Sequence, residues 1–234
     1  MLEIKNLFVN YGNLSIIQDL SMTIADKEIV ALIGANGMGK TTLVRALSKL
    51  NPVSGGTMTF DGADITHATT DKVVEMGIIQ VPEGRKLFPQ MSVRENLEMG
   101  AYAKRARGKE KENLEYVYSV FPELKAMEKN ACGNLSGGQQ QMVAIGRSIM
   151  ACPKLLILDE PSIGLSPITT QKMFEAIRII NKKGISILIT EQNVHDVLAM
   201  ADRAYVMQQG KIALEGDAKA ISSDEELKKI YIGM

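Results

Sequence analysis

The order of apolar and polar residues along the chain predicts two kinds of β-strand. Near the N-terminus, Leu20, Met22 and Ile24 alternate with polar residues, and Met58 and Phe60 do the same after a pair of glycines. A period of two is typical of antiparallel strands that expose one face to water. We therefore expect an N-terminal antiparallel β layer.

Three other segments are nearly continuous aliphatic runs, at residues 29–33, 155–158 and 185–189. This pattern indicates parallel strands that are buried on both faces between helices. The helices are expected at about residues 40–50, 69–76, 137–151, 167–183 and 192–202. Alternation of strands and helices predicts an α/β fold with a doubly wound sheet.

From Phe88 to about Asn130 the aliphatic runs disappear, and the segment is typical of helices with a charged, exposed middle. We expect residues 88–150 to form a helical subdomain inserted in one domain, whose α/β core comprises 1–87 and 151–234. The basic residues of segment 104–111 suit either a solvated connection between helices, which we favour, or a contact with phosphate or lipid. Near the C-terminus we expect a hairpin that turns at Gln209-Gly210, followed by a short helix rich in Glu and Lys.

Composition narrows the class of protein. The 234 residues are 45% hydrophobic, and 27 basic residues balance 27 acidic ones, which argues against a nucleic-acid binder. The start of the chain lacks the pattern of a signal peptide and no apolar run is long enough to span a membrane, so we expect a cytosolic protein. Cys132 and Cys152 are expected to be buried reduced thiols that form no metal cluster with His67 or His195.

Residues 34–41 match G-x-x-x-x-G-K-[ST] between an aliphatic strand and a helix, which predicts a loop that binds nucleoside triphosphate. Backbone N–H groups and the helix dipole would face the phosphates. Lys40 would bridge the β and γ phosphates, and the Thr41 hydroxyl would take one Mg²⁺ position. The expected nucleotide contacts of this phosphate loop are Gly34, Ala35, Asn36, Gly37, Met38, Gly39, Lys40, Thr41 and Thr42.

Asp159 and Glu160 follow the second aliphatic run. Two carboxylates at the end of a buried strand are costly without a cation. We expect Asp159 to hold Mg²⁺, usually through water, and Glu160 to orient and deprotonate the attacking water as the general base.

The segment Leu135-Ser136-Gly137-Gly138-Gln139 resembles the signature motif of ABC ATPases. The resemblance covers essentially the whole chain and implies a RecA-like P-loop NTPase that uses ATP and Mg²⁺. Ser136, Gly137, Gly138 and Gln139 would form a second anion-binding helix start. Two such sites on one small domain suggest that two ATPase domains dock head to tail, each signature facing its neighbour's ATP.

Further positions match this family in order, with three departures. Tyr11 lies where the family carries an aromatic that stacks on adenine, and residues 161–166 resemble the D-loop with Ser166 in place of the usual acid. Glu83 occupies the position of the Q-loop glutamine, where the family's residue would contact Mg²⁺, and Gln192 that of the switch histidine. Gln192 can still donate a hydrogen bond to the γ-phosphate, so we expect it to act in catalysis with Glu160 and Lys40. Gln80 is assigned to a strand and His195 to the surface.

Residues 81–85 (VPEGR) with 191–193 (EQN) resemble one subfamily, the LivF-type ATPases of branched-chain amino acid importers. That likeness implies a second ATPase subunit, two transmembrane permeases, an extracytoplasmic solute-binding protein and a peripheral place on the cytoplasmic face of the inner membrane. Urea-type importers share much of the pattern. One alternative is a non-transport ABC ATPase. A second alternative is a P-loop kinase or GTPase, but that function would leave residues 135–139 without a purpose.

Overall fold

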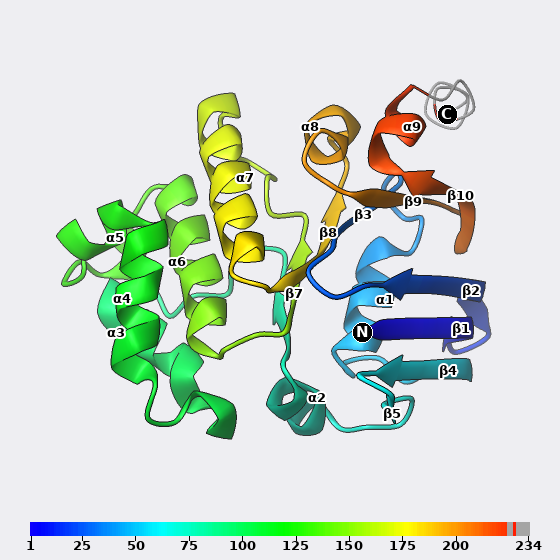
Figure 1. Cartoon of the computed structure of the whole chain (residues 1–234), viewed down its shortest axis with the longest axis horizontal. Helices are drawn as coiled ribbons and strands as arrows, with labels where there is room; N and C mark the ends of the chain where they lie inside the picture. Colours follow the sequence, from blue (N-terminus) through cyan, green and yellow to red (C-terminus); the bar gives the residue numbers. More distant parts are fainter. Residues whose placement is uncertain (224–226, 228–234) are drawn as a thin grey trace. The chain divides into compact units, whose positions relative to one another are not determined.

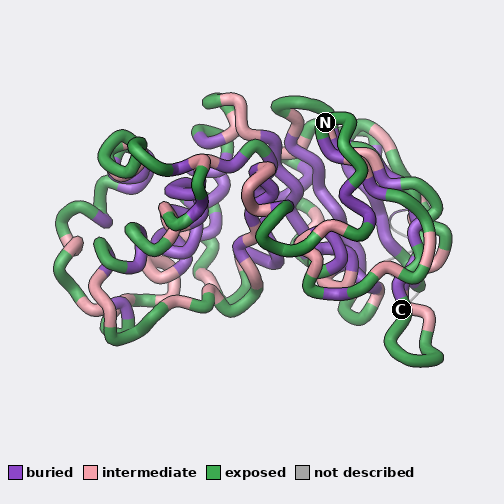
Figure 2. The backbone as a smooth tube through the Cα atoms, turned by 90° about the horizontal axis from the view of Figure 1, so that it is seen from below, coloured by how far each residue is buried: buried purple, intermediate pink, exposed green. Residues whose placement is uncertain are grey.

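The computed structural model describes residues 1–223 and 227. The chain forms two compact units, one comprising Met1–Val73 with Ser186–Met234 and the other Val74–Ile185. Figure 2 shows buried backbone concentrated in the interior of each unit and exposed backbone along the connecting loops.

An antiparallel sheet in the first unit has the strand order β2-β1-β4-β5 (Figure 1). Its strands are β1 (Leu2–Tyr11), β2 (Leu14–Ile24), β4 (Gly55–Phe60) and β5 (Ala63–Asp64). In β2 the side chains of Leu20, Met22 and Ile24 are buried while the residues between them are exposed, as the alternation predicts. The expected antiparallel β layer is confirmed in these strands.

The first unit also contains strand β3, which leads into the phosphate loop, and its neighbours in the order β10-β9-β3-β8. Strand β3 (Ile29–Ile33) runs parallel to β8 (Ser186–Glu191) and β9 (Arg203–Gln208), and β10 (Lys211–Asp217) returns antiparallel to β9. Every residue of β3 and β8 is buried, which explains their continuous aliphatic sequences. The helices of this unit are α1 (Lys40–Leu47), α8 (Val194–Leu198) and α9 (Ala218–Ser222), and α2 (Thr70–Met76) leads into the second unit.

The second unit contains a parallel strand pair and most of the helices. Strands β6 (Ile78–Val81) and β7 (Leu155–Asp159) pair along their length. Figure 1 shows α3, α4 and α6 side by side, and α3 and α4 both contact α6. The helices are α3 (Val93–Glu98), η1 (Met99–Tyr102), η2 (Lys104–Ala106), α4 (Glu110–Val120), α5 (Pro122–Ala126), η3 (Cys132–Asn134), α6 (Gly137–Met150) and α7 (Pro167–Lys182).

Some expectations need correction. The helix expected at 192–202 is the short α8, because the N–H of Asp202 donates to the carbonyl of Ile29 and so carries the chain toward β3. Helix α1 ends at Leu47 instead of about residue 50, and Lys49 then adopts a left-handed φ of 61°. Cys132 is buried, but Cys152 is only half-buried.

The C-terminal hairpin turns at Gln209-Gly210 as expected, whereas most of the predicted helix rich in Glu and Lys falls outside the described residues. None of the helices in the described part of the chain combines the length and the apolar character that a membrane crossing requires.

Candidate functional site

The phosphate loop joins the end of β3 to the start of α1. Gly37 and Gly39 adopt left-handed φ angles of 78° and 105°, which a residue with a side chain rarely adopts. Lys40 is only 4% exposed, and its Nζ donates to the carbonyls of Gly34 at 2.6 Å and Ala35 at 3.3 Å. A cationic ammonium is therefore enclosed by the loop, next to the N-terminus of α1, in the arrangement that suits an anion.

The loop is packed tightly against the hairpin formed by β9 and β10. A Cβ on Gly34 would lie 2.5 Å from the carbonyl oxygen of Met207, so no larger residue fits without displacing backbone. The carbonyl of Met38 accepts a hydrogen bond from the N–H of Gly210 at 3.2 Å. The curvature of the phosphate loop is thus fixed by contacts within the first unit.

Gln192 directly follows β8, the strand beside β3. Ile33 and Glu191 are register partners in this parallel pair, so the phosphate loop and Gln192 leave the sheet at the same edge. Glu191 is buried and Gln192 is exposed. The sheet therefore brings together two of the predicted elements, the phosphate loop and the proposed γ-phosphate sensor.

Tyr11 ends β1 and remains 47% exposed. Its hydroxyl accepts a hydrogen bond from the Asn51 side chain at 2.5 Å, and Asn51 is itself buried after α1. The phenol is thus anchored at one end while much of the side chain stays open to solvent. Partial exposure of this kind is what the predicted stacking on adenine requires.

Asp159 and Glu160 lie in the second unit, at the end of β7, and they are only 3% and 7% exposed. Glu160 has a left-handed φ of 49°, unusual for a residue with a side chain. Strained backbone of this kind is concentrated at functional sites, where the surrounding structure holds it. The carboxylate proposed as general base thus stands on a constrained turn.

The signature segment begins α6, also in the second unit. Ser136 is the N-cap, and its Oγ accepts from the N–H of Gln139 at 3.3 Å while the Gln139 side chain accepts from the N–H of Ser136 at 2.9 Å. Ser136 is exposed, and the next three residues are half-buried. The segment forms a capped helix start that is accessible to solvent, as its sequence predicts.

Ser166, which stands where the family usually has an acidic residue, has a structural role. Ser166 caps α7, accepting at its Oγ from the N–H of Thr169 at 3.3 Å, and Pro167 takes the first helical position. A Cβ on Gly138 would lie 2.5 Å from the Thr169 methyl group, so the start of α6 packs closely on the start of α7. Serine therefore serves at this position as a helix cap.

The loop after β6 contains Glu83, which is exposed, while Gln80 lies within the strand as expected. Sequence reasoning missed the contacts that this loop makes with α6. The Arg147 side chain donates to the carbonyls of Arg85 and Lys86. Burial lowers the pKa of Arg147 from its usual value. No periodic signal marks this contact, because it joins a turn to a helix about sixty residues later.

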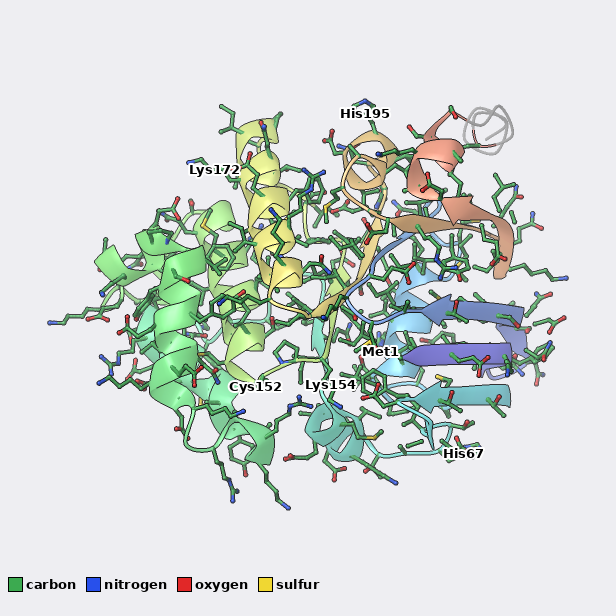
Figure 3. All side chains as sticks on the ribbon, in the orientation of Figure 1. Met1, His67, Cys152, Lys154, Lys172 and His195 are labelled. Atoms are coloured by element: carbon green, nitrogen blue, oxygen red, sulfur yellow. The ribbon has the colours of Figure 1, made fainter. Side chains whose placement is uncertain are left out.

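His67 and His195 are not among the predicted site residues. His195 projects into solvent with its side chain 90% exposed, which confirms its assignment to the surface, and Figure 3 shows it at the opposite end of the first unit from His67. Among residues 1–223 and 227, no group of three or more His, Cys, Asp or Glu side chains is arranged to hold a metal ion.

Comparison with known proteins places the chain in a family. Residues 17–163 match the family described as ABC transporter. The chain is 36% identical to the high-affinity branched-chain amino acid transport ATP-binding protein BraG of Pseudomonas aeruginosa, with both chains covered in full. It is 32% identical to the probable branched-chain amino acid transport ATP-binding protein LivF of Archaeoglobus fulgidus, covering 100% of this chain and 99% of the relative. The lipopolysaccharide export system ATP-binding protein LptB of Haemophilus influenzae is also 32% identical, covering 100% of this chain and 97% of the relative.

The solved structures agree with the sequences. An ATP-binding cassette of an ABC transporter, determined in its ADP conformation, superposes with a TM-score of 0.87 at 29% identity, covering 100% of this chain and 99% of that one. The predicted α/β P-loop NTPase fold is confirmed by this likeness. The chain belongs to the ABC transporter family, and it is an ATP-binding, ATP-hydrolysing subunit of that family.

Proposed function

We propose that this ATPase powers the import of branched-chain amino acids. The observation that carries the proposal is similarity along the whole chain to BraG and LivF, whose names specify branched-chain amino acid transport. Residues 81–85 and 191–193 support it, since they resemble the LivF-type pattern. ATP hydrolysis supplies the energy, and the transported solute is selected by other subunits.

In this proposal the triphosphate is held by the phosphate loop, with Tyr11 stacked on the adenine. Lys40 exchanges its hydrogen bonds to the carbonyls of Gly34 and Ala35 for bonds to the β and γ phosphates. The signature segment, Ser136 to Gln139, presents its helix start to ATP bound by a second ATPase subunit.

Hard oxygen donors in this chain suit Mg²⁺, and we assign the Thr41 hydroxyl and the carboxylates of Asp159 and Glu83 to it. Mg²⁺ in ATPases takes few protein ligands because substrate phosphates and water complete its shell. When bound, the ion neutralises negative charge on the β and γ phosphates.

We assign the hydrolytic step to Glu160 and Gln192. The Glu160 carboxylate accepts a proton from the water that attacks the γ-phosphorus, as the bond between that phosphorus and ADP breaks. The Gln192 amide donates a hydrogen bond to a γ-phosphate oxygen, and being neutral it does not titrate. Release of phosphate then removes the group that links two docked subunits.

The proposed complex contains this chain, a second similar ATPase, two transmembrane permeases and an extracytoplasmic solute-binding protein. The chain would lie on the cytoplasmic face of the membrane. Residues 88–150 would act as a helical signature subdomain, relaying opening and closing of the ATPase pair to the permeases.

A second candidate is lipid export. The LptB relative is as similar in sequence as LivF, and its name specifies lipopolysaccharide export. A urea-type importer is a third possibility that fits the same motifs.

Purification of the tagged chain from membranes, followed by identification of its partners, tests the proposal. The expected partners are two permeases and a solute-binding protein that binds leucine, isoleucine or valine in calorimetry. ATP-dependent uptake of the same amino acids by the complex in proteoliposomes would complete the evidence. Partners of the lipid-export type, or a binding protein that takes only urea, would overturn the amino acid assignment while leaving the ATPase activity intact.

A further inference from the structure

The loop from Glu83 to Phe88 has an unusual backbone. Gly84, Arg85 and Lys86 adopt successive left-handed φ angles of 76°, 64° and 48°. Left-handed conformations cost free energy for residues with a side chain, so two in succession require surrounding contacts to hold them.

Arg147, on α6, supplies contacts that hold the loop. Its Nη2 donates to the carbonyl of Lys86 at 2.8 Å and to that of Arg85 at 3.1 Å, and its guanidinium lies 5.8 Å from the centre of the Phe88 ring. Both carbonyls belong to the left-handed residues, so their hydrogen bonds stabilise this loop conformation. The backbone of the loop is thereby fixed to the last turn of α6.

Arg85 extends the connection to the beginning of the same helix. Its Nη1 donates to the side-chain oxygen of Gln140 at 3.3 Å, and its guanidinium lies 3.0 Å from where a Cβ on Gly137 would stand. A Cβ at position 137 would require the Arg85 guanidinium to shift by a few tenths of an ångström. The Arg85 side chain therefore lies directly against the signature segment.

Gln140 also bonds to the backbone that precedes the signature segment. Its amide nitrogen donates to the carbonyls of Cys132 at 3.1 Å and Leu135 at 3.3 Å, the latter immediately before Ser136. One continuous series of hydrogen bonds thus runs from Arg85 through Gln140 to the backbone that positions the signature serine. The donors of the planar Arg85 guanidinium point in fixed directions, so their hydrogen bonds can fix the orientation of the group that accepts them.

We propose that Arg85 is a positioning residue that ties the orientation of the signature segment to the conformation of the loop carrying Glu83. The inference rests on the proposed function, in which the signature segment contacts ATP on a second subunit. A change in the 83–88 loop would then alter the signature helix start of the same chain through Arg85 and Gln140.

The test compares Arg85→Met with Lys86→Met in the full-length protein. Both variants remove one positive charge from a left-handed position of the same loop, but only Arg85 bonds to Gln140 through its side chain. We expect Arg85→Met to raise amide hydrogen exchange in residues 135–139 about tenfold and to lower kcat for ATP about tenfold, with KM changed less than about twofold. Lys86→Met should match the wild type in both measurements.

Gln140→Met, which removes the acceptor and leaves Arg85 in place, should reproduce the increase in exchange, and the double variant should add little to either single variant. Arg85→Lys, which keeps the positive charge but lacks the planar guanidinium, should resemble Arg85→Met in its lowered kcat. Unchanged exchange at 135–139 in Arg85→Met would overturn the inference, whatever the hydrolysis rate and whatever Gln140→Met shows, because Gln140 also bonds directly to the carbonyls of Cys132 and Leu135. Partners of another kind of transporter would instead count against the proposed function, since the exchange measurement does not depend on the transported solute.

Discussion

Ile33 and Glu191 are register partners at the ends of the parallel strands β3 and β8, so the phosphate loop and Gln192 emerge side by side from the same edge of the sheet. This placement is consistent with the role in γ-phosphate sensing that we propose for Gln192. Residue 192 is exposed to solvent, so the polar amide of Gln192 is accommodated there without the cost of burying it.

Gln192 should matter for turnover more than for binding. We expect Gln192→Ala to lower kcat about 10- to 100-fold with little change in KM, because the hydrogen bond to the γ-phosphate strengthens in the transition state. Gln192→His should introduce an inflection near pH 6.5 in the rate profile, about the usual pKa of imidazole. His195→Ala, at the neighbouring solvent-exposed histidine, serves as the control and should behave as the wild type.

Glu160 should be required for hydrolysis alone. Glu160→Gln keeps the shape of the side chain but cannot accept a proton, so kcat should fall about 10²- to 10⁴-fold. ATP binding, measured with a fluorescent analogue, should persist. Turnover equal to that of the wild type would refute the assignment of the general base.

Two capping boxes in the second unit offer a matched pair. Ser136 with Gln139 caps α6, and Ser92 with Glu95 caps α3. Ser136→Ala and Ser92→Ala should each cost about 0.5–2 kcal/mol of unfolding free energy in urea. Only Ser136→Ala should also lower kcat, and an equal loss of activity in both would reduce Ser136 to a structural cap.

Lys49 should link stability to pH. Burial lowers the pKa of Lys49 to about 8, although nearby Asp64 partly offsets this. Since the folded pKa lies below the ordinary value of 10.5, the unfolded chain binds more protons between about pH 8 and 10.5, and stability should rise with pH across that window. Urea unfolding from pH 7.5 to 10 should show the wild type gaining stability relative to Lys49→Met and Lys49→Arg, neither of which loses a proton in this range. Parallel curves for all three proteins would contradict the prediction.

Local pattern was enough to predict the buried strands. Strand β3 has the predicted bounds, and β7 and β8 differ from their predicted bounds by one or two residues, because continuous aliphatic sequence reflects burial on both faces. Long-range contacts were not predictable in this way. Helix α8 ends early because Asp202 bonds to Ile29, and the 83–88 loop owes its shape to Arg147.

The motifs indicated candidate residues for the chemistry, since glycines, a lysine and paired acids appear at spacings that phosphate binding requires, and their roles stay predictions. They did not predict how those residues are supported. The anchor of Tyr11 on Asn51 and the link from Arg85 to Gln140 join positions 40 and 55 residues apart, which no local pattern records.

The close approach of Gly34 to the carbonyl oxygen of Met207 has a consequence for sequence variation in the ATPase. Strand β9 packs against the phosphate loop, so we expect substitutions at Met207 to change nucleotide affinity by shifting the backbone of the loop. Screens for altered ATP affinity should therefore recover variants near residue 207 as well as in the loop itself.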